Sequence, residues 1–404
     1  MCFTYTYIKK ELIEISVFGI TGTNGKTSVT YILRQLLEAR GETNALIGTI
    51  MHNTGKHVYN AINTTPSKAL LKEYFQEIEM SKIDNCIMEI SSHGIAQKRI
   101  EEIDIHYGAF TNLSRDHLDY HQDMWEYFKV KRKLFDITQK GDVINIDDSY
   151  GKLLYDGLKS KLKEIKKDIF TVSQNDIKAD VYGNVLEHSL NNSKVAICFR
   201  ETLIGEVIFP MMGKAAVYNL LIAIGLAIMS DKNKYISNNQ INAKYILDGL
   251  AAFKGVPGRF EVIGGNEKAE VIIDYAHTPD ALEMLLKEVR ANSKGRIITV
   301  FGCGGDRDKG KRFVMGKIAG ALSDYCIITS DNSRSEKPIE IMREIERGMV
   351  TTGCNYSLVE GRYQGISRAA FIAKRGDVIV IAGKGHENYP FNDKEAALEI
   401  LGKS

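Results

Sequence analysis

This sequence has few cysteines, no long apolar run and no excess of one charge. Only 6 of its 404 residues are cysteines, scattered without a C-x-x-C pair, which is typical of reduced, buried thiols in a cytosolic protein. No charge-free apolar run reaches the length of about 18 residues that a membrane span needs. Charges interrupt residues 1–15, so no signal peptide is expected. The sequence therefore predicts a cytoplasmic protein with no membrane contact.

The balance of charge excludes a further class of proteins. The 53 basic and 51 acidic residues leave a formal net charge of +2, which argues against a nucleic-acid binder that relies on a broad basic field. A local basic pocket for phosphate is still compatible with this balance. With 44% hydrophobic and 26% charged residues the chain is globular, and its length predicts two or three domains.

Strands alternate with helices along the first part of the chain. The β-rich residues 15–20 lead through a glycine loop into residues 28–37, whose apolar positions have a helical spacing. Further strands are expected at residues 86–90, 107–110 and 143–146, and a helix at residues 124–138. This alternation predicts an α/β fold with a mainly parallel sheet that helices cover on both faces.

The pattern then changes twice. Short β-like runs at residues 168–210 predict a small antiparallel insertion, after which a helix at residues 215–229 returns to the first domain. Two glycines and a proline at residues 254–258 predict a domain boundary. A second, Rossmann-like α/β unit follows, with strands expected at residues 271–274, 297–301, 325–329 and 378–381. We therefore expect a short N-terminal remnant (1–15), a central P-loop domain (16–254) and a C-terminal domain (255–404).

The loop after the first strand has the composition of a phosphate-binding loop. Its residues are Gly22, Thr23, Asn24, Gly25, Lys26 and Thr27. A loop of this kind directs backbone N–H groups and a helix N-terminus at phosphate, its lysine neutralises charge, and its hydroxyl binds Mg²⁺. Ile20 stands where the strict pattern has glycine, and the alternative is a tight turn that happens to contain two glycines. The Lys-Thr pair in register favours ATP binding.

Polar residues follow two later strands. Glu89 ends the strand at 86–90, and His117 lies in the polar segment 111–121. Because the carboxyl ends of parallel strands meet at one sheet edge, we expect both near Lys26, where Glu89 is a natural Mg²⁺ ligand beside ATP. An isolated histidine is more often structural, and the shared sheet edge is what favours a functional His117.

These segments together resemble the Mur ligases, and within them the MurE type. The resemblance is carried, in order, by TGTNGKT (21–27), NTTP (63–66), EISSHG (89–94), NLSRDHLDYH (112–121), KVKRKLF (129–135), PGRFE (257–261), DYAHTPDAL (274–282), GCGGDRDKGKR (302–312), DNSRSE (331–336) and AGKGHE (382–387). It covers residues 16–390, and so many segments in the right order do not agree by chance.

The resemblance implies an ATP-dependent amide ligase. Mur ligases activate a carboxylate with ATP as an acyl phosphate, which an amino group then attacks to form the amide. Lys26 and Thr27 would hold the phosphates and Mg²⁺, and Glu89 and His117 would bind two Mg²⁺ ions. Lys131 would be carbamylated and become a further metal ligand, because a carbamate converts a cation into an anion that Mg²⁺ accepts. Lys26, His117 and Lys131 would thus be the catalytic residues. Lys129 and Lys133 are the alternatives to Lys131 in the same segment, but they are better explained as exposed lysines of a helix.

The resemblance also assigns residues to the substrates. They are Asn219, Arg259 and Asp274 for the nucleotide, with His277 near it or structural, and Thr64, Thr65 and Ser91 for a substrate. Ala215 and Ala216 depart from the phenylalanine and asparagine that are usual in the family, and one nucleotide contact is lost with them.

The choice of amino acid within the MurE type follows one short segment. DNPR accompanies meso-diaminopimelate, and enzymes that use L-lysine lack its arginine. Here the segment is DNSR (331–334), in which serine replaces proline and Arg334 is kept. A guanidinium binds a carboxylate through two parallel N–H bonds, so Arg334 favours meso-diaminopimelate over lysine. The other positions that match this pocket are Arg307, Asn332, Gly383 and Glu387.

One domain of MurE-type enzymes has no counterpart in this sequence. Only 18 residues precede Gly19, too few for the N-terminal domain that binds uridine diphosphate. We therefore expect a truncated or shortened ligase that adds meso-diaminopimelate to a UDP-MurNAc-L-Ala-D-Glu-like acceptor. The alternatives are a specialised ligase for a non-UDP carboxylate, and a nucleotide-binding subunit whose partner protein supplies the missing acceptor domain. No nucleic-acid partner is expected.

Overall fold

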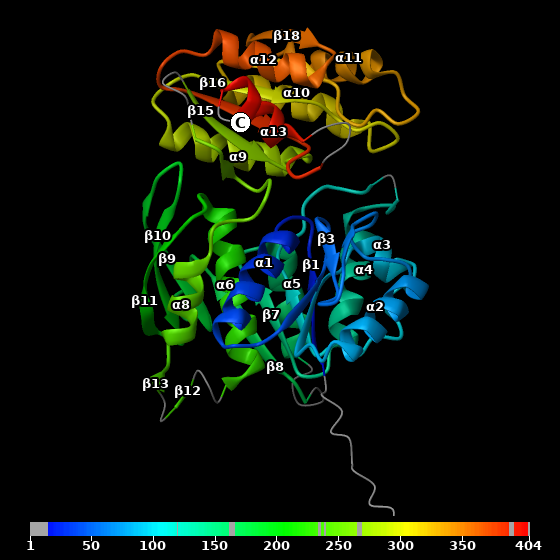
Figure 1. Cartoon of the computed structure of the whole chain (residues 1–404), viewed down its shortest axis with the longest axis vertical. Coiled ribbons are helices and arrows are strands. Elements are labelled where there is room, and N and C mark those ends of the chain that lie inside the picture. Colours follow the sequence, from blue (N-terminus) through cyan, green and yellow to red (C-terminus); the bar gives the residue numbers. More distant parts are fainter. Residues whose placement is uncertain are drawn as a thin grey trace, which may run out of the picture.

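Two β-sheets, one above the other in Figure 1, organise this chain. The computed structural model describes residues 15–118, 120–160, 166–232, 236–237, 240–264, 269–387 and 392–402. Residues 1–14, and with them nearly all of the predicted N-terminal remnant, lie outside the described residues.

The larger sheet has the strand order β11-β10-β9-β8-β7-β6-β1-β5-β2-β3-β4. In chain order its strands are β1 (Ser16–Thr21), β2 (Asn44–Ile47), β3 (Met51–Asn53), β4 (Val58–Asn60), β5 (Asn85–Glu89), β6 (Tyr107–Phe110), β7 (Gly141–Asn145), β8 (Asp168–Ser173), β9 (Val181–His188), β10 (Ser193–Phe199) and β11 (Thr202–Phe209). The strands from β9 to β2 in this order run parallel to one another, whereas β10 is antiparallel to β9 and β3 is antiparallel to β2. Ile20 of β1 pairs with Glu89 of β5 and Ala109 of β6, so the loops after these three strands emerge at one edge.

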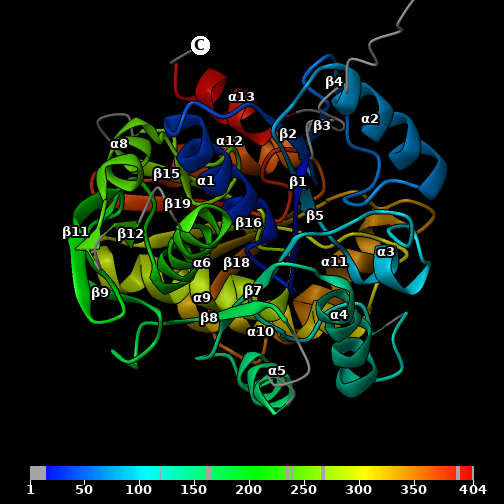
Figure 2. The same cartoon turned by 90° about the horizontal axis from the view of Figure 1, so that it is seen from below.

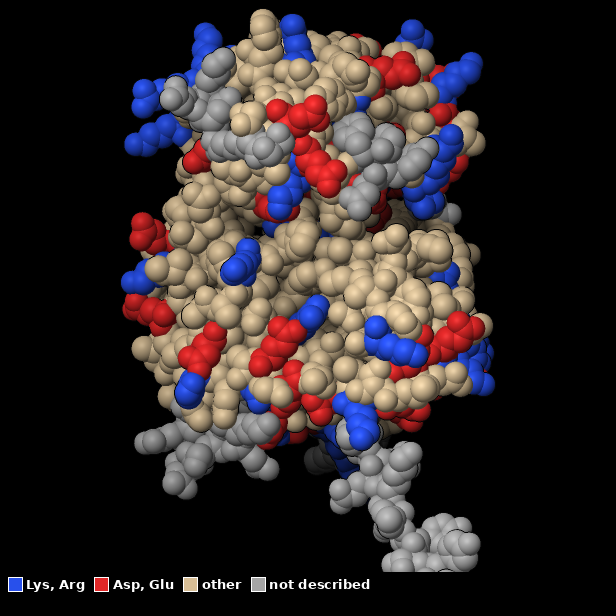
Figure 3. All heavy atoms as spheres, viewed as in Figure 1, with Lys and Arg blue, Asp and Glu red and all other residues tan. Residues whose placement is uncertain are grey.

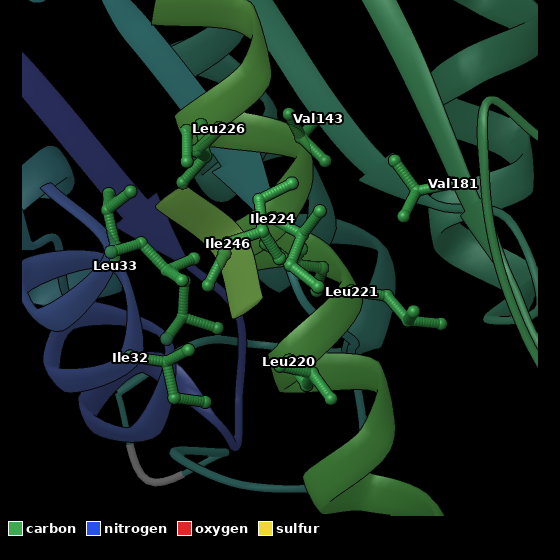
Figure 4. Close-up of a cluster of buried hydrophobic side chains, with 14 of the residues drawn as sticks. Ile32, Leu33, Val143, Val181, Leu220, Leu221, Ile224, Leu226 and Ile246 are labelled. Atoms are coloured by element: carbon green, nitrogen blue, oxygen red, sulfur yellow. The ribbon is translucent and has the colours of Figure 1, made fainter. Parts of the chain in front are cut away.

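Helices cover both faces of this sheet. One face carries α1 (Lys26–Ala39), α6 (Lys214–Ser230) and α8 (Lys244–Ala252); the other carries α2 (Lys68–Met80), α3 (Ser92–Ala96), α4 (Met124–Ile137) and α5 (Ser149–Lys159). Figure 4 shows Ile32 and Leu33 of α1 on one side of α6, and Leu221 of α6 pointing to the other side, where Val181 of β9 lies. Each such side chain contributes about 1.5–3 kcal/mol when it is fully buried. Since α6 is apolar on nearly all sides, it forms the centre of this layer.

The smaller sheet has the order β14-β15-β19-β16-β17-β18, and all neighbours but β14 and β15 are parallel. Its strands are β14 (Glu261–Val262), β15 (Ala269–Asp274), β16 (Ile297–Phe301), β17 (Tyr325–Thr329), β18 (Asn355–Val359) and β19 (Asp377–Ala382). Helices α9 (Pro279–Asn292), α10 (Gly310–Leu322) and α11 (Pro338–Met349) pack on one face, and α12 (Arg362–Ile372) and α13 (Asp393–Ile400) on the other. Figure 2 shows the two sheets from below, one behind the other.

The predicted α/β architecture is confirmed, with differences in detail. The antiparallel part begins at Val181, because β8 joins the larger sheet parallel to β7. The predicted small antiparallel part is thus present, as an extension of the larger sheet. A second antiparallel part, β2-β3-β4, and the short hairpin of β12 (Ile236–Ser237) and β13 (Gln240–Ile241) were not predicted. Within the part of the chain that the structure describes, no helix has the length and apolar character needed to cross a membrane.

Candidate active site

The predicted phosphate loop lies where β1 passes into α1. Gly22 and Gly25 have φ values of 146° and 89°, in the region that favours glycine. A Cβ atom on Gly22 would lie 1.8 Å from Thr111 Oγ1, and one on Gly25 would lie 2.2 Å from Asn219 Oδ1. Both glycines are therefore required for this close packing, which brings Asn219 of α6 beside the loop.

The N-terminus of α1 opens toward a cavity of about 800 Å³ that residues 23–27 help to line. Gly25, at the N-cap, offers no side chain to the first N–H groups of the helix. Lys26 Nζ donates to the carbonyl oxygens of Gly22 and Thr23, both at 2.9 Å, and burial lowers its pKa. Because the first N–H groups of a helix have no partner within the helix, this end suits a phosphate.

Glu89 lies in the same cavity, next to the loop threonine. Its carboxylate accepts hydrogen bonds from Thr27 Oγ1 at 3.0 Å and from both N and Oγ1 of Thr49 at 2.8 Å. A carboxylate and a hydroxyl are oxygen ligands of the kind that Mg²⁺ takes together with water and phosphate. Among the described residues no three His, Cys, Asp or Glu side chains cluster into a metal site. The donor set thus fits an ion that takes part of its ligands from a bound nucleotide.

His117 follows β6 and lies on the wall of this cavity, where the sheet-edge argument expects it. Its Nε2 lies 3.4 Å from Asp116 Oδ2, and the same oxygen lies 3.9 Å from Nε2 of His277. Burial lowers the pKa of each histidine to about 4, against the attraction of Asp116. A neutral imidazole keeps a lone pair for a metal ion, so His117 is competent as a ligand.

Lys131 lies behind the phosphate loop and not on the cavity wall. Its side chain is buried, donates to the carbonyl oxygen of Gly22 at 2.9 Å, and has Nζ 4.8 Å from the centre of the Tyr127 ring. Burial, with the nearby charge of Lys26, lowers the pKa of Lys131 well below its ordinary value. Lys129 and Lys133 are exposed on the same helix. Lys131 is therefore the lysine of α4 whose surroundings favour a neutral amine.

The loops after β16, β17 and β19 line the opposite side of the cavity. They contribute the five residues predicted for the amino-acid pocket: Arg307, Asn332, Arg334, Gly383 and Glu387. Burial raises the pKa of Glu387, which accepts a hydrogen bond from the hydroxyl of Tyr275 at 3.1 Å. Both sheets thus present the carboxyl ends of their parallel strands to one space, as is usual for ligand sites in α/β folds. Figure 3 shows a hollow at the junction of the two halves.

Thr64 and Ser91 line the cavity near Glu89, whereas Thr65 supports them from behind. Thr65 is buried, and its hydroxyl lies 2.9 Å from the Glu89 carbonyl oxygen and 3.1 Å from Ser91 Oγ. Arg99, which sequence reasoning missed, lines the same end and donates from Nη1 to the Thr65 carbonyl oxygen at 2.6 Å. No local pattern distinguished this arginine from one on the surface.

A smaller hollow of about 130 Å³ adjoins the phosphate loop between α6 and α9. Its apolar lining comes from Met211, Met212, Ala215, Ala216, Met284 and Leu285, so both departures from the family pattern lie on its wall. Asn219, Arg259 and Asp274 also line it. Burial raises the pKa of Asp274, whose carboxylate accepts from the N–H groups of Phe260 and Ala276. An apolar slot beside a phosphate loop has the shape and chemistry for a nucleobase.

Arg259 joins the two halves of the site. It comes from the segment before β14, donates to Thr27 Oγ1 at 3.1 Å, and lies with its guanidinium 4.2 Å from the centre of the Tyr275 ring. Sequence reasoning assigned no role to Asp116, Tyr275, Lys311 or His386, which also line the cavity. All four lie inside the segments that carry the resemblance, but only the fold reveals that their side chains reach one space.

Two family models match this chain. The model described as the Mur ligase middle domain matches residues 20–227, and the model described as the Mur ligase, glutamate ligase domain, matches residues 258–385.

Similar proteins cover nearly the whole chain. UDP-N-acetylmuramoyl-L-alanyl-D-glutamate–2,6-diaminopimelate ligase 1 of Clostridium acetobutylicum is 40% identical over 96% of this chain and 78% of its own length. The ligase of the same name, without the number, from Clostridioides difficile is 41% identical over 96% of this chain and 79% of its own length. A solved structure with this ligase name has a TM-score of 0.67 at 31% identity, covering 97% of this chain and 79% of its own.

Proposed function

The chain belongs to the Mur ligase family, and we propose that it joins the amino group of meso-diaminopimelate to the D-glutamyl carboxylate of UDP-N-acetylmuramoyl-L-alanyl-D-glutamate. The observation that carries this proposal is that the phosphate loop, Glu89 and the loop with Arg334 all line the same cavity. The relatives named for this reaction, at about 40% identity over nearly the whole chain, support it.

Mur ligases use ATP and Mg²⁺. In this chain we assign the β- and γ-phosphates to the loop of residues 22–27, with Lys26 as the cation that faces them. Thr27, Glu89 and His117 are the proposed ligands for two Mg²⁺ ions, which would balance the phosphate charge during transfer. The open end of α1 supports this assignment, because its N–H groups have no side-chain cap.

The nucleoside end of ATP is assigned to the smaller hollow. Asn219 and Asp274 lie on its wall, and Arg259 reaches from there to Thr27. A guanidinium at this point would neutralise charge on the transferred phosphate, which is the main requirement of phosphoryl transfer. Ala215 and Ala216 offer this hollow no hydrogen bonds from their side chains, so the base would be held mainly by its fit.

The carboxylate substrate is assigned to the end of the cavity near Thr64, Thr65 and Ser91. These hydroxyls lie beside Glu89, so a carboxylate held there is close to the proposed Mg²⁺ ions. Arg99 adds a positive charge at the same end. In the proposed reaction the carboxylate oxygen attacks the γ-phosphorus and ADP leaves, and the amine then displaces phosphate from the acyl carbon and loses a proton.

The amino acid is assigned to the opposite side of the cavity. Arg334 and Arg307 would bind the distal carboxylate of diaminopimelate, which lysine lacks. Asn332, Gly383 and Glu387 would contact its polar groups. Lysine should therefore react far more slowly, and a ratio of kcat/KM near one for the two amino acids would contradict this assignment.

Carbamylation of Lys131 is part of the proposal. The lysine is buried, and its lowered pKa favours the neutral amine that attacks carbon dioxide with loss of a proton. The carbamate would keep one N–H for the Gly22 carbonyl oxygen and direct its new negative charge toward Lys26 and a metal ion. With ¹³C-labelled bicarbonate, we expect one carbamate NMR resonance that Lys131→Met loses and the matched exposed variant Lys133→Met keeps. A resonance present in both variants would refute it.

We propose that the chain divides into units of residues 16–254 and 255–404, each with one sheet. A cytoplasmic location follows from the use of ATP and a nucleotide-linked substrate. Supply of acceptor-binding surface by a partner protein remains a prediction that no comparison supports.

The activity is tested with the purified chain, ATP, Mg²⁺, meso-diaminopimelate and the UDP-linked dipeptide. We expect phosphate release that requires both the amino acid and the dipeptide, with the tripeptide product seen by mass spectrometry. Lys26→Met should abolish turnover while the protein stays folded by circular dichroism. Phosphate release that ignores either substrate would contradict the proposed function.

A further inference from the structure

Two loops of the smaller sheet carry the arginines assigned to the amino acid. The first acceptor loop, residues 302–309, follows β16 and carries Arg307; the second acceptor loop, residues 330–337, follows β17 and carries Arg334. Arg334 Nη1 donates to the Gly305 carbonyl oxygen at 2.7 Å. A Cβ atom on Gly305 would lie 1.9 Å from the Ser333 carbonyl oxygen, so the backbones are in direct contact. The position of one arginine therefore depends on the other loop.

Glu336 joins these loops to a buried cation. Its Oε1 accepts from the N–H of Asp306 at 2.6 Å and from Arg312 Nη2 at 2.7 Å, and its Oε2 accepts from Arg312 Nη1 at 2.9 Å. Lys309 Nζ lies 3.3 Å from the same carboxylate. Arg312 is fully buried on α10 and also donates to the Gly304 carbonyl oxygen. A bidentate pair of this kind fixes direction as well as distance.

Glu344 provides a natural comparison. It comes from α11, which lies beside α10 in Figure 1, and accepts from Arg312 Nη1 at 2.9 Å. Both glutamates thus pair with the same buried guanidinium, but among the described residues no hydrogen bond or ion pair joins Glu344 to either acceptor loop. Of these two glutamates, Glu336 is the one that also accepts a hydrogen bond from the first acceptor loop, through the N–H of Asp306.

The backbone of both loops is held in an unusual conformation. Asp306 and Arg334 have φ values of 52° and 50°, which non-glycine residues adopt only when surrounding contacts enforce it. Ser335 supplies such contacts, since its N–H and hydroxyl donate to the Asp306 carboxylate at 3.1 and 2.7 Å. Without these ties we expect both segments to relax toward ordinary backbone angles.

We infer that Glu336 is a positioning residue that fixes Arg307 and Arg334 for the distal carboxylate of a diamino acid, and so determines selection against amino acids that lack it. This inference rests on the proposed function. Bidentate recognition tolerates little displacement, so a looser loop loses affinity for the dicarboxylic amino acid. Lysine, which has no distal carboxylate, gains nothing from the fixed arginines and loses nothing when they move.

The test compares Glu336→Gln with Glu344→Gln, each of which removes one charge beside Arg312. For Glu336→Gln we expect the KM for meso-diaminopimelate to rise about tenfold, the KM for ATP to stay as in the wild type, and the ratio of kcat/KM for diaminopimelate over lysine to fall about tenfold. Glu344→Gln should keep the wild-type ratio. A purely structural role of Glu336 would lower kcat for both amino acids equally and leave the ratio unchanged.

A second variant covers the case in which Glu336→Gln does not fold. Ser335→Ala removes only an exposed contact to Asp306, and a fall of about threefold in the same ratio is expected. The inference is overturned if wild-type enzyme prefers diaminopimelate and neither variant changes that preference, or if Glu344→Gln changes it as much as Glu336→Gln. If the wild-type chain itself does not ligate diaminopimelate, the proposed function fails instead.

Discussion

Glu89 concentrates the chemistry of the site in one side chain. It is buried, accepts hydrogen bonds from Thr27 and Thr49, and faces the cavity beside the phosphate loop. A glutamine at this position would keep only some of these hydrogen bonds, because its NH₂ group cannot accept one. The negative charge that Mg²⁺ requires would be lost altogether.

We therefore predict that Glu89→Gln lowers turnover about 100-fold and raises the Mg²⁺ concentration needed for half-maximal rate. Removal of Mg²⁺ by a chelator should stop turnover of the wild type. Glu77→Gln is the matched control, because Glu77 also accepts from two hydroxyl groups, those of Thr54 and Tyr59, but lies outside the cavity. Equal Mg²⁺ dependence in the two variants would exclude Glu89 as a ligand.

His52 offers a separate prediction on stability. It is buried on β3 next to the Tyr74 ring, and burial lowers its pKa to about 4. Within the described part of the chain, its Nδ1 has no hydrogen-bond partner. Since the unfolded histidine titrates near 6.5, its contribution to stability is complete above about pH 6.5 and is lost as the pH falls toward 4. The free energy of unfolding, measured with urea, should therefore fall less between pH 6.5 and 4 for His52→Phe than for the wild type. Identical pH profiles would contradict this.

The residues of the site differ in how well the sequence predicts them. Lys26, Thr27 and Glu89 follow directly from a phosphate loop and from a carboxylate at the end of a parallel strand. Asp116 and Arg99 do not, because their roles depend on contacts with residues far along the chain, such as His277. The contact between Asp116 and His277 is set by the packing of the two sheets, and that between Arg99 and Thr65 by the folding of the larger-sheet part.

At the scale of elements, burial explains which strands the sequence predicts. β6, β16 and β17 agree with their predicted residues, and nearly all of their side chains are buried in continuous apolar runs. β4 and β18 were missed because none of their residues is buried, and β4 is also only 3 residues long. Such strands depend on pairing with a neighbour, which a single-sequence pattern does not record.

At this scale the clearest prediction concerns the loop between β1 and α1. Gly25→Ala puts a Cβ atom against Asn219 at a φ of 89°, so the loop must shift. We expect the Kd for ATP, measured by calorimetry, to rise at least about tenfold. Gly157→Ala is the control, since this glycine lies in α5 with open space around it and should stabilise the protein by about 0.5–1 kcal/mol. Unchanged ATP binding in Gly25→Ala would contradict the assignment of the loop.

At the scale of the whole molecule, the site exists only where the two sheets meet. The larger sheet contributes the phosphate loop and Glu89, and the smaller sheet contributes Arg259 and the acceptor loops. Contacts between Arg115 and Asp308, and between Lys214 N and Glu288, also join the two parts. The proposed phosphoryl transfer and amide formation would thereby share one cavity, as a ligase that activates a carboxylate requires.

The first chemical step that we propose in this cavity is the conversion of a carboxylate into an acyl phosphate, before the amine attacks. It is tested most directly with UDP-linked dipeptide whose D-glutamyl carboxylate carries ¹⁸O, incubated with ATP, Mg²⁺ and meso-diaminopimelate. We predict that ³¹P NMR finds one ¹⁸O atom in each phosphate released, because the carboxylate oxygen leaves with the phosphorus. Phosphate free of ¹⁸O, or ¹⁸O found in AMP, would contradict the account.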